Sequence, residues 1–417
     1  MSEVSLFFWS NNLNRYSINA LLGALETFKL LSWCKVHFFK NIEEIELSLE
    51  KEKIIFCFSF SSFNLLTVKS TIDYLKKKFP TALFLAGGPH PTGDYKGTLD
   101  LGFDYVFLGE GEKSFPLFIK NFIEDKDLKN IPGIAFKQKG RLVKNKKELI
   151  DFNSYLPFSK QLKRFGPLEI TRGCPFACKY CQTSYIFGPK VRHRSLEVLL
   201  EWVRFFKQKK LLDFRFITPN ALAYGSKDGK EVNLEAIEEL LAKVKEIAPQ
   251  GRIFFGSFPS EVRPEQVSVK SLKVLSRWVD NQNLVIGAQS GSDKILELSG
   301  RKHTAGDVLE AVKLARKFNF LPVVDFIFGL PQESWEDEQK SILLMRQIVE
   351  LGGKVHAHTF IPLPGTPWAR KPAGKVSAQM RREMTSLIAK GLGFGNWEAQ
   401  EKEASRLAKY FQTRKLE

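Results

Sequence analysis

Three of the five cysteines in this 417-residue chain lie within eight residues, as Cys174, Cys178 and Cys181. Thiolates are soft ligands that suit iron–sulfur clusters, and three at the spacing C-x3-C-x2-C can hold three corners of a [4Fe–4S] cube. Cys34 and Cys57 stand far upstream, so the fourth iron is left open to a substrate or cofactor. A structural zinc site usually needs a second cysteine pair, and none follows here.

This motif follows a segment ending in Thr-Arg-Gly and resembles the signature of the radical S-adenosylmethionine (SAM) enzymes. The resemblance implies that Cys174, Cys178 and Cys181 hold the cluster, and that its open iron binds the amino and carboxylate groups of SAM. It also implies reductive cleavage of SAM to a 5′-deoxyadenosyl radical, with electrons from a donor such as flavodoxin or ferredoxin. Tyr180 would lie against the adenine and is a catalytic candidate.

Residues 1–125 alternate short apolar runs with amphipathic stretches, which predicts an α/β domain with a parallel, doubly wound, Rossmann-like sheet. The expected strands are Val4–Trp9, Cys34–Phe39, Ile54–Phe58, Ala82–Ala86 and Tyr105–Leu108. Ligands of such sheets bind at the carboxyl ends of the strands. The small and polar residues there are Ser10, Asn11, Ser59, Ser61, Gly87, Gly88, Pro89, His90, Gly109, Glu110, Gly111 and Glu112. No G-x-G-x-x-G follows the first strand, which counts against a nicotinamide or flavin dinucleotide.

The runs Gly-Gly-Pro-His-Pro-Thr at 87–92, Gly-Glu-Gly-Glu at 109–112 and Ile-Pro-Gly-Ile-Ala at 131–135 resemble the cobalamin-binding domain found upstream of many radical SAM modules. The resemblance implies that these strand-end residues line a cobalamin site. The Asp-x-His-x-x-Gly motif that supplies a lower axial histidine is absent, so we expect no histidine beneath the cobalt. His90 is the alternative ligand, although a loop histidine between two prolines more often bonds the backbone.

Residues 126–166 read as a linker containing a basic hairpin. Over residues 167–370 the β-α alternation resumes and predicts a partial (β/α)6 barrel, the radical SAM domain, with its active site at the carboxyl ends of the strands. The expected strands are Leu168–Thr171, Phe214–Ile217, Ile253–Phe258, Leu284–Ala288, Val323–Phe328 and His356–Ile361. Residues 371–417 read as a short helical, amphipathic C-terminal extension.

Polar residues follow these strands where bound SAM needs a partner for its carboxylate, acceptors for its ribose hydroxyls and an apolar slot for adenine. A cap or a surface position is the alternative for each of them. The candidates are Arg263 or Arg301 for the carboxylate, Glu261, Gln289 and Ser290 for the hydroxyls, Ile361 with Pro362 for adenine, and Ser257 beside them.

Histidines form a further candidate site at the last expected strand. His356 and His358 share a face of that strand at positions i and i+2, and could hold a metal or act on a substrate. Core and loop positions are the commoner outcome, but if either acts we expect His358 to accept a proton or to contact the substrate. Asp325 lies mid-strand and reads as a core carboxylate. His193 and His303 stand in basic segments that read as exposed, and no role is predicted for them.

The formal charge of +17 is spread along the chain, which favours a solvated surface while permitting RNA, anionic lipid or acidic metabolites as partners. No apolar run reaches the length of a bilayer span and no signal peptide is recognisable. An odd number of cysteines, three of them clustered, argues against a disulfide framework. These features predict a cytoplasmic protein without a transmembrane segment.

The run Gln289–Ser292, then Arg301, then Asp325–Pro331 resembles the radical SAM branch shared by methylthiotransferases and cobalamin-dependent methylases. The combined resemblances imply methylation of an unactivated carbon, in which one SAM methylates cobalt and another generates the radical. The alternatives are rearrangement or cyclisation without methyl transfer, methylthiolation of RNA, and a non-enzymatic corrinoid carrier. The further cysteines and C-terminal β-barrel of methylthiotransferases are not recognisable. A small molecule or lipid is therefore favoured over RNA as substrate, and the oligomeric state is not predicted.

Overall fold

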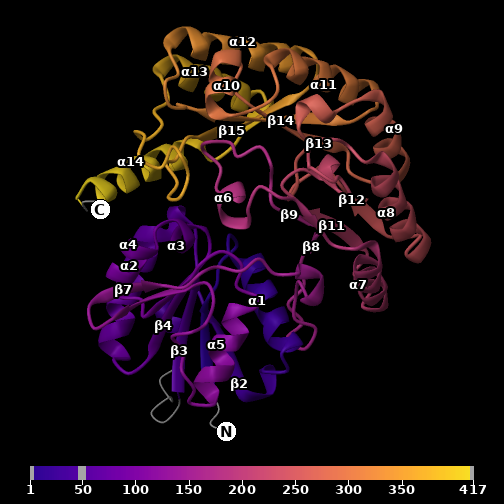
Figure 1. The fold of residues 1–417 in the computed structure, drawn as a ribbon. Coiled ribbons are helices and arrows are strands. Elements are labelled where there is room, and N and C mark those ends of the chain that lie inside the picture. Colours follow the sequence, from indigo (N-terminus) through magenta and orange to yellow (C-terminus); the bar gives the residue numbers. More distant parts are fainter. Residues whose placement is uncertain (1–3, 46–52, 414–417) are drawn as a thin grey trace. The chain divides into compact units, whose positions relative to one another are not determined.

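The computed structural model describes residues 4–45 and 53–413. Contacts within the chain divide it into two compact units (Figure 1). The first unit comprises residues 1–166 with 363–365, and the second comprises residues 167–362 with 366–417. None of the helices that the structure describes combines the length and apolar composition needed to cross a lipid bilayer.

The first unit is built on a seven-stranded sheet in the order β2-β1-β3-β4-β5-β6-β7. Five strands are parallel and confirm the predicted doubly wound sheet: β1 (Val4–Trp9), β2 (Cys34–Phe39), β3 (Lys53–Ser59), β4 (Leu83–Gly87) and β5 (Tyr105–Phe107). All six residues of β1 are buried, as expected for a strand covered on both faces. The strand order reverses between β1 and β3, so the loops after these two strands flank the crevice where such sheets bind ligands.

Helices lie on both faces of this sheet (Figure 1). One face packs against α1 and α5, whose apolar side chains join those of β1 and β3 in a single core. The helices of the unit are α1 (Arg15–Thr27), α2 (Leu65–Lys78), α3 (Pro89–Gly93), α4 (Tyr95–Asp100) and α5 (Ser114–Ile123).

The segment predicted as a linker, residues 126–166, is part of the first unit. Strands β6 (Ile134–Gln138) and β7 (Arg141–Lys144) form the predicted basic hairpin and extend the sheet antiparallel to β5. The chain then runs along α1, where a Cβ on Gly23 would lie 2.4 Å from the carbonyl oxygen of Leu156. The first three residues of β6 are buried, but the rest of the hairpin is largely exposed, and its basic side chains made the segment resemble a linker in sequence.

The second unit is a partial barrel of parallel strands. Strands β8 (Leu168–Glu169), β11 (Asp213–Ile217) and β12 (Arg252–Phe254) form one sheet, and β13 (Asn283–Gln289), β14 (Leu321–Phe328), β15 (Lys354–Thr359) and β16 (Gly393–Phe394) form another. A bridge between Val262 and Ile286 and a hydrogen bond from Val285 N to Gly256 O (2.8 Å) join the two sheets. Each of the six predicted strands is present, although β8 ends at Glu169 and β12 at Phe254, short of the predicted ends at Thr171 and Phe258.

Helices follow the barrel strands and form an outer layer (Figure 1). Their apolar faces are buried, as in α8, where Ile237, Leu240, Leu241 and Val244 point inward. They are α7 (Leu196–Gln208), α8 (Leu234–Ile247), α9 (Val269–Trp278), α10 (Asp293–Ser299), α11 (Ala305–Lys317) and α12 (Trp335–Glu350). The short helix α6 (Thr183–Phe187) follows the cysteine stretch and lies in sequence between two short strands, β9 (Thr171–Arg172) and β10 (Arg192–His193), which pair with each other antiparallel.

The predicted C-terminal extension adds a seventh strand to this barrel. Its helices α13 (Ala378–Ala389) and α14 (Trp397–Thr413) flank β16, which pairs in parallel with β15. A Cβ on Gly395, where φ is +135°, would lie 2.1 Å from the carbonyl oxygen of Ala357, so this joint depends on glycine. A two-residue strand has no periodicity to detect, which is why the sequence indicated only helices. Residues 414–417 of the predicted extension lie outside the described residues.

Candidate active site

The three clustered cysteines lie in the loop between β9 and α6. The loop begins at Gly173, where φ is +83° and a Cβ would lie 2.2 Å from the carbonyl oxygen of Lys190. Cys174 N donates to Gly188 O (3.2 Å), the Ser184 hydroxyl donates to Cys174 O (2.7 Å), and Cys181 N donates to Cys178 O (3.0 Å). These bonds fold the loop tightly around its thiols, which form no disulfide.

The three thiols of the loop are placed to bind a group of metal cations. Burial raises the pKa of the Cys174 and Cys181 thiols, and the neighbouring Cys178 raises both further. Three thiolates this close would repel one another unless cations bound them. Since thiolate is the soft ligand that iron–sulfur clusters use, these residues fit a [4Fe–4S] cluster.

Tyr180 connects the cysteine loop to an apolar cluster in the barrel. Its ring lies 6.4 Å from that of Trp368 and packs with Ile295, Leu330 and Phe360. Its hydroxyl lies 3.5 Å from Nη1 of Arg301, so one end of the ring is apolar and the other polar. That environment suits a flat, partly polar group such as adenine.

Three predicted SAM-binding residues converge on Gly287 in β13. A Cβ at Gly287 would lie 2.9 Å from Gln289 Nε2, 3.2 Å from Arg301 Nη2 and 3.2 Å from Glu261 Oε2. Arg301 donates to the carbonyl oxygen of Gly287. Burial raises the pKa of Glu261 to about 7, against the lowering effect of Arg301, so this carboxyl changes charge near neutral pH.

Arg263 lies beside the cysteine loop. Its guanidinium carbon lies 3.5 Å from the ring centroid of Phe176, and its Nε donates to Oε1 of Glu265 (2.5 Å). Among the described residues, its buried Nη2 has no hydrogen-bond partner, and the buried hydroxyl of Ser257 also has none. A buried, unsatisfied guanidinium N–H is costly, and a carboxylate such as that of SAM would satisfy it.

The hydroxyl of Ser290, a predicted SAM contact, is bonded within the barrel. Ser290 directs its hydroxyl to that of Ser341 in α12 (3.3 Å) and accepts the N–H of Ser292 (3.2 Å), so it secures α12. A register shift between Gly287 and Gln289 turns the chain at this point, which the sequence pattern could not indicate. Pro362 is buried just after β15.

His303, for which no role was predicted, is buried and contacts Arg301. Its Nε2 lies 3.0 Å from Ala288 O, and Arg301 Nε donates to its Nδ1 (3.3 Å). Burial, helped by Arg301 and Arg263, lowers its pKa to about 2. His303 is therefore a neutral support that orients Arg301. Its basic neighbours made it read as exposed.

His193 is within hydrogen-bond distance of the Thr171 hydroxyl (2.9 Å) and of the carbonyl oxygen of Ser226 (2.8 Å).

The predicted histidine pair lies on β15 with Asp325 opposite on β14. His356 Nδ1 lies 2.8 Å from Asp325 Oδ1, and the rings of His356 and His358 are 4.3 Å apart. One ligand atom from each of these three residues lies within 4.8 Å of the others. Gln400 of α14, which sequence reasoning missed, lies 3.2 Å from His358 Nδ1.

In the first unit, hydrogen bonds join the four predicted strand-end loops in series. Asn14, which sequence reasoning also missed, donates from Nδ2 to Trp9 O and Ser59 O (both 2.9 Å), linking the loops after β1 and β3. Phe60 N donates to Gly87 O (3.0 Å), and Gly109 N donates to the Thr92 hydroxyl (3.0 Å), linking the remaining two. The predicted residues are therefore brought to one edge of the sheet.

Some of these residues are buried and make hydrogen bonds within the first unit. His90 is fully buried, with Nδ1 2.8 Å from the Ser62 hydroxyl and its ring stacked on Phe60 at 5.4 Å. Glu110 accepts the N–H of Ile150 (3.1 Å). Because His90 is enclosed and bonded to Ser62, its placement does not suit a lower axial ligand.

The other strand-end residues are mostly glycines and serines. Gly88 has φ of +96°, and a Cβ there would lie 2.9 Å from Phe60 N, so glycine is required. Ser59 exchanges a hydrogen bond with the Ser17 hydroxyl (2.8 Å), and Ser61 donates to Asn64 Oδ1 (3.4 Å). The remaining predicted residues are Gly87 at the end of β4, Pro89 at the start of α3, and Gly111 and Glu112 before α5.

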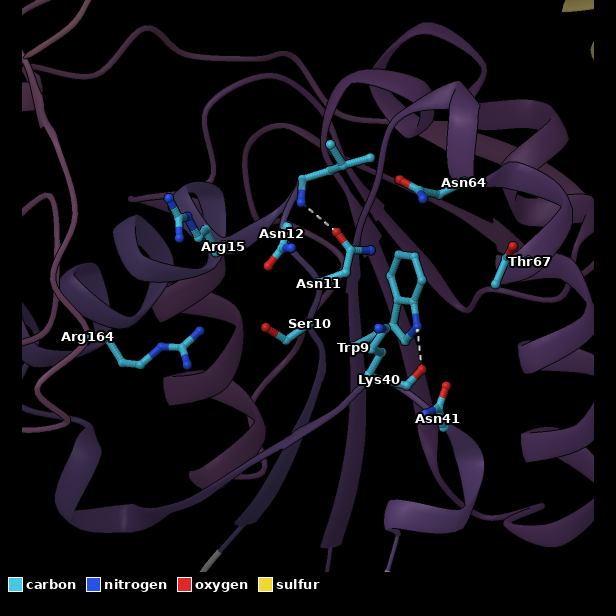
Figure 2. A pocket seen from close by; sticks show the side chains of 11 residues that line it. Trp9, Ser10, Asn11, Asn12, Arg15, Lys40, Asn41, Asn64, Thr67 and Arg164 are labelled. Carbon is cyan, nitrogen blue, oxygen red and sulfur yellow. Dashed lines mark hydrogen bonds between the residues drawn. The ribbon is translucent and has the colours of Figure 1, made fainter. Parts of the chain in front are cut away.

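A pocket of about 580 Å³ opens beside the loops after β1 and β2 (Figure 2). Asn11 accepts the N–H of Leu13 (2.8 Å), and Trp9 Nε1 donates to Lys40 O (3.2 Å). The lining combines cations and amides and includes Ser10, Asn11, Asn12, Arg15, Lys40, Asn41, Asn64 and Arg164. These groups fit the amide and phosphate groups that cobalamin carries.

Two family models match the chain. Residues 168–345 match the radical SAM superfamily, and residues 37–119 match the B12-binding domain. The chain therefore carries a B12-binding domain followed by a radical SAM domain. These domains imply a [4Fe–4S] cluster, SAM and cobalamin as cofactors.

Similar sequences include a putative methylthiotransferase of Methanocaldococcus jannaschii, 29% identical over 72% of this chain and 66% of the relative. An uncharacterized methyltransferase of Pyrococcus horikoshii is 26% identical over 67% of this chain and 61% of the relative. The tRNA-2-methylthio-N(6)-dimethylallyladenosine synthase of Pelobacter propionicus is 31% identical over 51% of this chain and 49% of the relative. The chain thus spans between 49% and 66% of these relatives' lengths.

Solved structures share the fold. The radical SAM methyltransferase TsrM of Kitasatospora setae, with cobalamin and [4Fe–4S] cluster bound, superposes with a TM-score of 0.67 at 16% identity, covering 89% of this chain and 78% of that one. The same enzyme with a tryptophan substrate and a SAM analogue gives 0.65 at 14% identity, covering 88% of this chain and 75% of that one. The cobalamin-dependent radical SAM enzyme OxsB with aqua-cobalamin gives a TM-score of 0.63 at 16% identity, covering 83% of this chain and 52% of that one.

Proposed function

We propose that this chain, which carries a B12-binding domain and a radical SAM domain, is a cobalamin-dependent radical SAM methyltransferase that acts on an unactivated carbon. The observation that carries the proposal is the presence in one chain of two donor sets. One is the three-cysteine loop with the buried Arg263 beside it, and the other is the linked series of strand-end loops in the first unit.

When bound, the cluster supplies reductive cleavage of SAM and cobalamin supplies a methyl carrier, so the protein's task is to bind and align them. Cys174, Cys178 and Cys181 hold the cluster, and Arg263 binds the carboxylate of SAM. Arg301, Gln289 and Glu261 bind its polar groups around Gly287, and Tyr180 lies against its adenine. An external one-electron donor such as flavodoxin or ferredoxin is required.

A small molecule is the substrate class that we favour. TsrM, whose fold matches over most of this chain, has been solved with a tryptophan substrate. The inner face of the barrel here combines the aromatic rings of Tyr180, Phe360 and Trp368 with the polar side chains of Asp325 and His356. Such a mixed lining suits a partly apolar molecule that carries a few polar groups.

RNA methylthiolation is the second candidate, because a tRNA-modifying synthase is 31% identical over half of this chain. The B12-binding match at residues 37–119 favours methyl transfer over it. Rearrangement or cyclisation without methyl transfer is the third possibility, since the shared fold of the cobalamin-dependent SAM radical enzyme OxsB does not specify the reaction.

The fate of the SAM methyl group separates these candidates. Reconstituted protein would be given dithionite, cobalamin, [methyl-²H₃]SAM and fractionated small-molecule, lipid and RNA extracts. Methylation predicts 5′-deoxyadenosine together with a product carrying the labelled methyl on carbon. Label on sulfur in a tRNA nucleoside would establish methylthiolation, and 5′-deoxyadenosine without labelled product would favour rearrangement. Cys178→Ala should abolish both products, whereas the control Cys34→Ala, which removes a cysteine of the first unit, should retain them.

A further inference from the structure

We propose that Asp325, His356, His358 and Gln400 form a proton-transfer site on the inner face of the barrel, which takes a proton from an O–H or N–H group of the substrate. The proposal rests on the proposed function, since it assigns the polar end of that function's substrate. Its evidence is a set of hydrogen bonds that place the ring proton on Nδ1 of His356 and on Nε2 of His358.

Strand register places these side chains on the inner face. Asp325 pairs with His356 and Ile327 with His358 across β14 and β15. Ile327 packs against the apolar cluster of Ile295, Leu330, Phe360 and Trp368, and Tyr180 of the cysteine loop packs against the same cluster, so this face is the one toward that loop. The alternate residue Ala357 is fully buried on the opposite face.

Gln400 determines the proton position on His358. The Thr359 N–H donates to Oε1 of Gln400 (2.8 Å), so the amide must direct its NH₂ group toward His358. That NH₂ group lies 3.2 Å from Nδ1 of His358, which must therefore act as the acceptor. The neutral ring then carries its proton on Nε2.

His358 is consequently a donor that resists taking a second proton. Protonation at Nδ1 would place two N–H donors face to face. Burial and the neighbouring His356 lower the pKa of His358, which is consistent with a neutral ring. Among the described residues, Nε2 makes no hydrogen bond, so it is available to an acceptor atom of a ligand.

His356 is arranged in the opposite sense. Its Nδ1–H donates to Oδ1 of Asp325 (2.8 Å), which leaves a lone pair on Nε2. A carboxylate at Nδ1 stabilises the imidazolium that forms when Nε2 takes a proton. The ring is held flat against Phe394, with centroids 4.5 Å apart and planes 17° apart.

His356 can accept a proton at Nε2, and His358 can donate a hydrogen bond from Nε2. Together they suit a substrate group that carries an O–H or N–H next to an acceptor atom, such as a carboxamide, a hydroxy-carbonyl or an N–H heteroaromatic ring. The proton of the substrate O–H or N–H moves to Nε2 of His356, whose positive charge faces Asp325. The electron pair stays on the substrate oxygen or nitrogen, where Nε2–H of His358 donates to it. No oxidant or reductant takes part in this step.

Nitrogen NMR of the cluster-reconstituted protein, labelled with ¹⁵N in its six histidines, tests the assignment. We expect His358 protonated at Nε2 only and His356 protonated at Nδ1 at neutral pH. Gln400→Glu replaces the amide NH₂ with an acceptor, so it should place a proton on Nδ1 of His358 and raise its pKa by more than one unit. The control Gln379→Glu, at a residue paired with Gln339, should change neither ring. A proton on Nδ1 of wild-type His358 would overturn the assignment.

The catalytic part is tested with His356→Asn, which can still donate to Asp325 but cannot accept a proton. In cells given [methyl-²H₃]methionine, the labelled product should fall at least 50-fold, while SAM cleavage by the purified variant stays within threefold of wild type. Unchanged product would refute the site. Retention of one added zinc ion by the dialysed holoprotein, lost in His356→Asn, would mean a metal site instead. If wild type fails to cleave SAM, the proposed function fails while the NMR assignment stands.

Discussion

The guanidinium carbon of Arg263 lies 3.5 Å from the ring centroid of Phe176, which stands between two of the three clustered cysteines. This stacking joins the strand-end segment after β12 to the cysteine loop. Because Nη2 of Arg263 is buried without a hydrogen-bond partner among the described residues, the arginine is held ready for an anionic group beside the loop.

Replacing Arg263 by lysine should weaken SAM binding. Lysine keeps the charge but loses the planar stacking and the paired N–H donors, so we expect the Kd for SAM to rise about tenfold, or about 1.4 kcal/mol. Calorimetry on reconstituted protein measures this change, with iron content as the check that the cluster remains. Arg252→Lys, at an exposed residue paired with Asp213, is the matched control and should leave the Kd unchanged.

Gly287→Ala tests whether the residues around β13 form a single binding site. The new methyl group would lie 2.9 Å from Gln289 Nε2 and 3.2 Å from both Arg301 and Glu261, so these side chains must shift. We expect the Kd for SAM to rise about tenfold. The same substitution at Gly306, inside α11 and with 3.5 Å to its nearest neighbour, should instead stabilise the fold by about 0.5–1 kcal/mol. An unchanged Kd in Gly287→Ala would contradict the site.

Glu261 should make stability depend on pH. Burial raises its folded-state pKa to about 7, above its usual 4.5, so the folded state holds a proton that the unfolded state has lost. The contribution of Glu261 to the free energy of unfolding is therefore fully present below pH 4.5. As the pH rises to about 7 the free energy of unfolding falls by about 3 kcal/mol. Denaturant unfolding of wild type and Glu261→Gln across this range should show the variant gaining relative stability as pH rises. A constant difference would count against a raised pKa.

His90→Ala should destabilise the first unit without changing the ligation of bound cobalamin. The substitution leaves a cavity next to Phe60 and removes the partner of the Ser62 hydroxyl, so we expect a loss of about 2–4 kcal/mol. Thermal unfolding and the absorption spectrum of the corrinoid are the two readouts. A shifted cobalt spectrum with unchanged stability would make His90 an axial ligand after all.

Local sequence signals predicted the elements that carry their own periodicity. The apolar run Val4–Trp9 could be located because β1 is buried on both faces, and β15 could be located because its buried residues alternate with half-buried ones. The cysteine motif located the loop because its chemistry is concentrated in a few adjacent residues.

What the sequence could not provide depends on contacts between distant residues. β16 has only two residues and exists through its pairing with β15. Ser290 faces Ser341 because the register shifts at Gly287 and Gln289, a change that leaves no trace in hydropathy. Asn14 and Gln400 are ordinary polar residues in sequence, and only the fold brings them to Ser59 and His358.

The presence of two cofactors is tested most directly by the content of iron, sulfide and corrinoid in protein purified without oxygen from cells supplied with cobalamin. We expect about four irons and about one corrinoid per chain. We also expect that Cys178→Ala loses the iron while retaining the corrinoid, because the two cofactors depend on different units. A full cluster with no corrinoid in the wild-type protein would contradict the two-cofactor account.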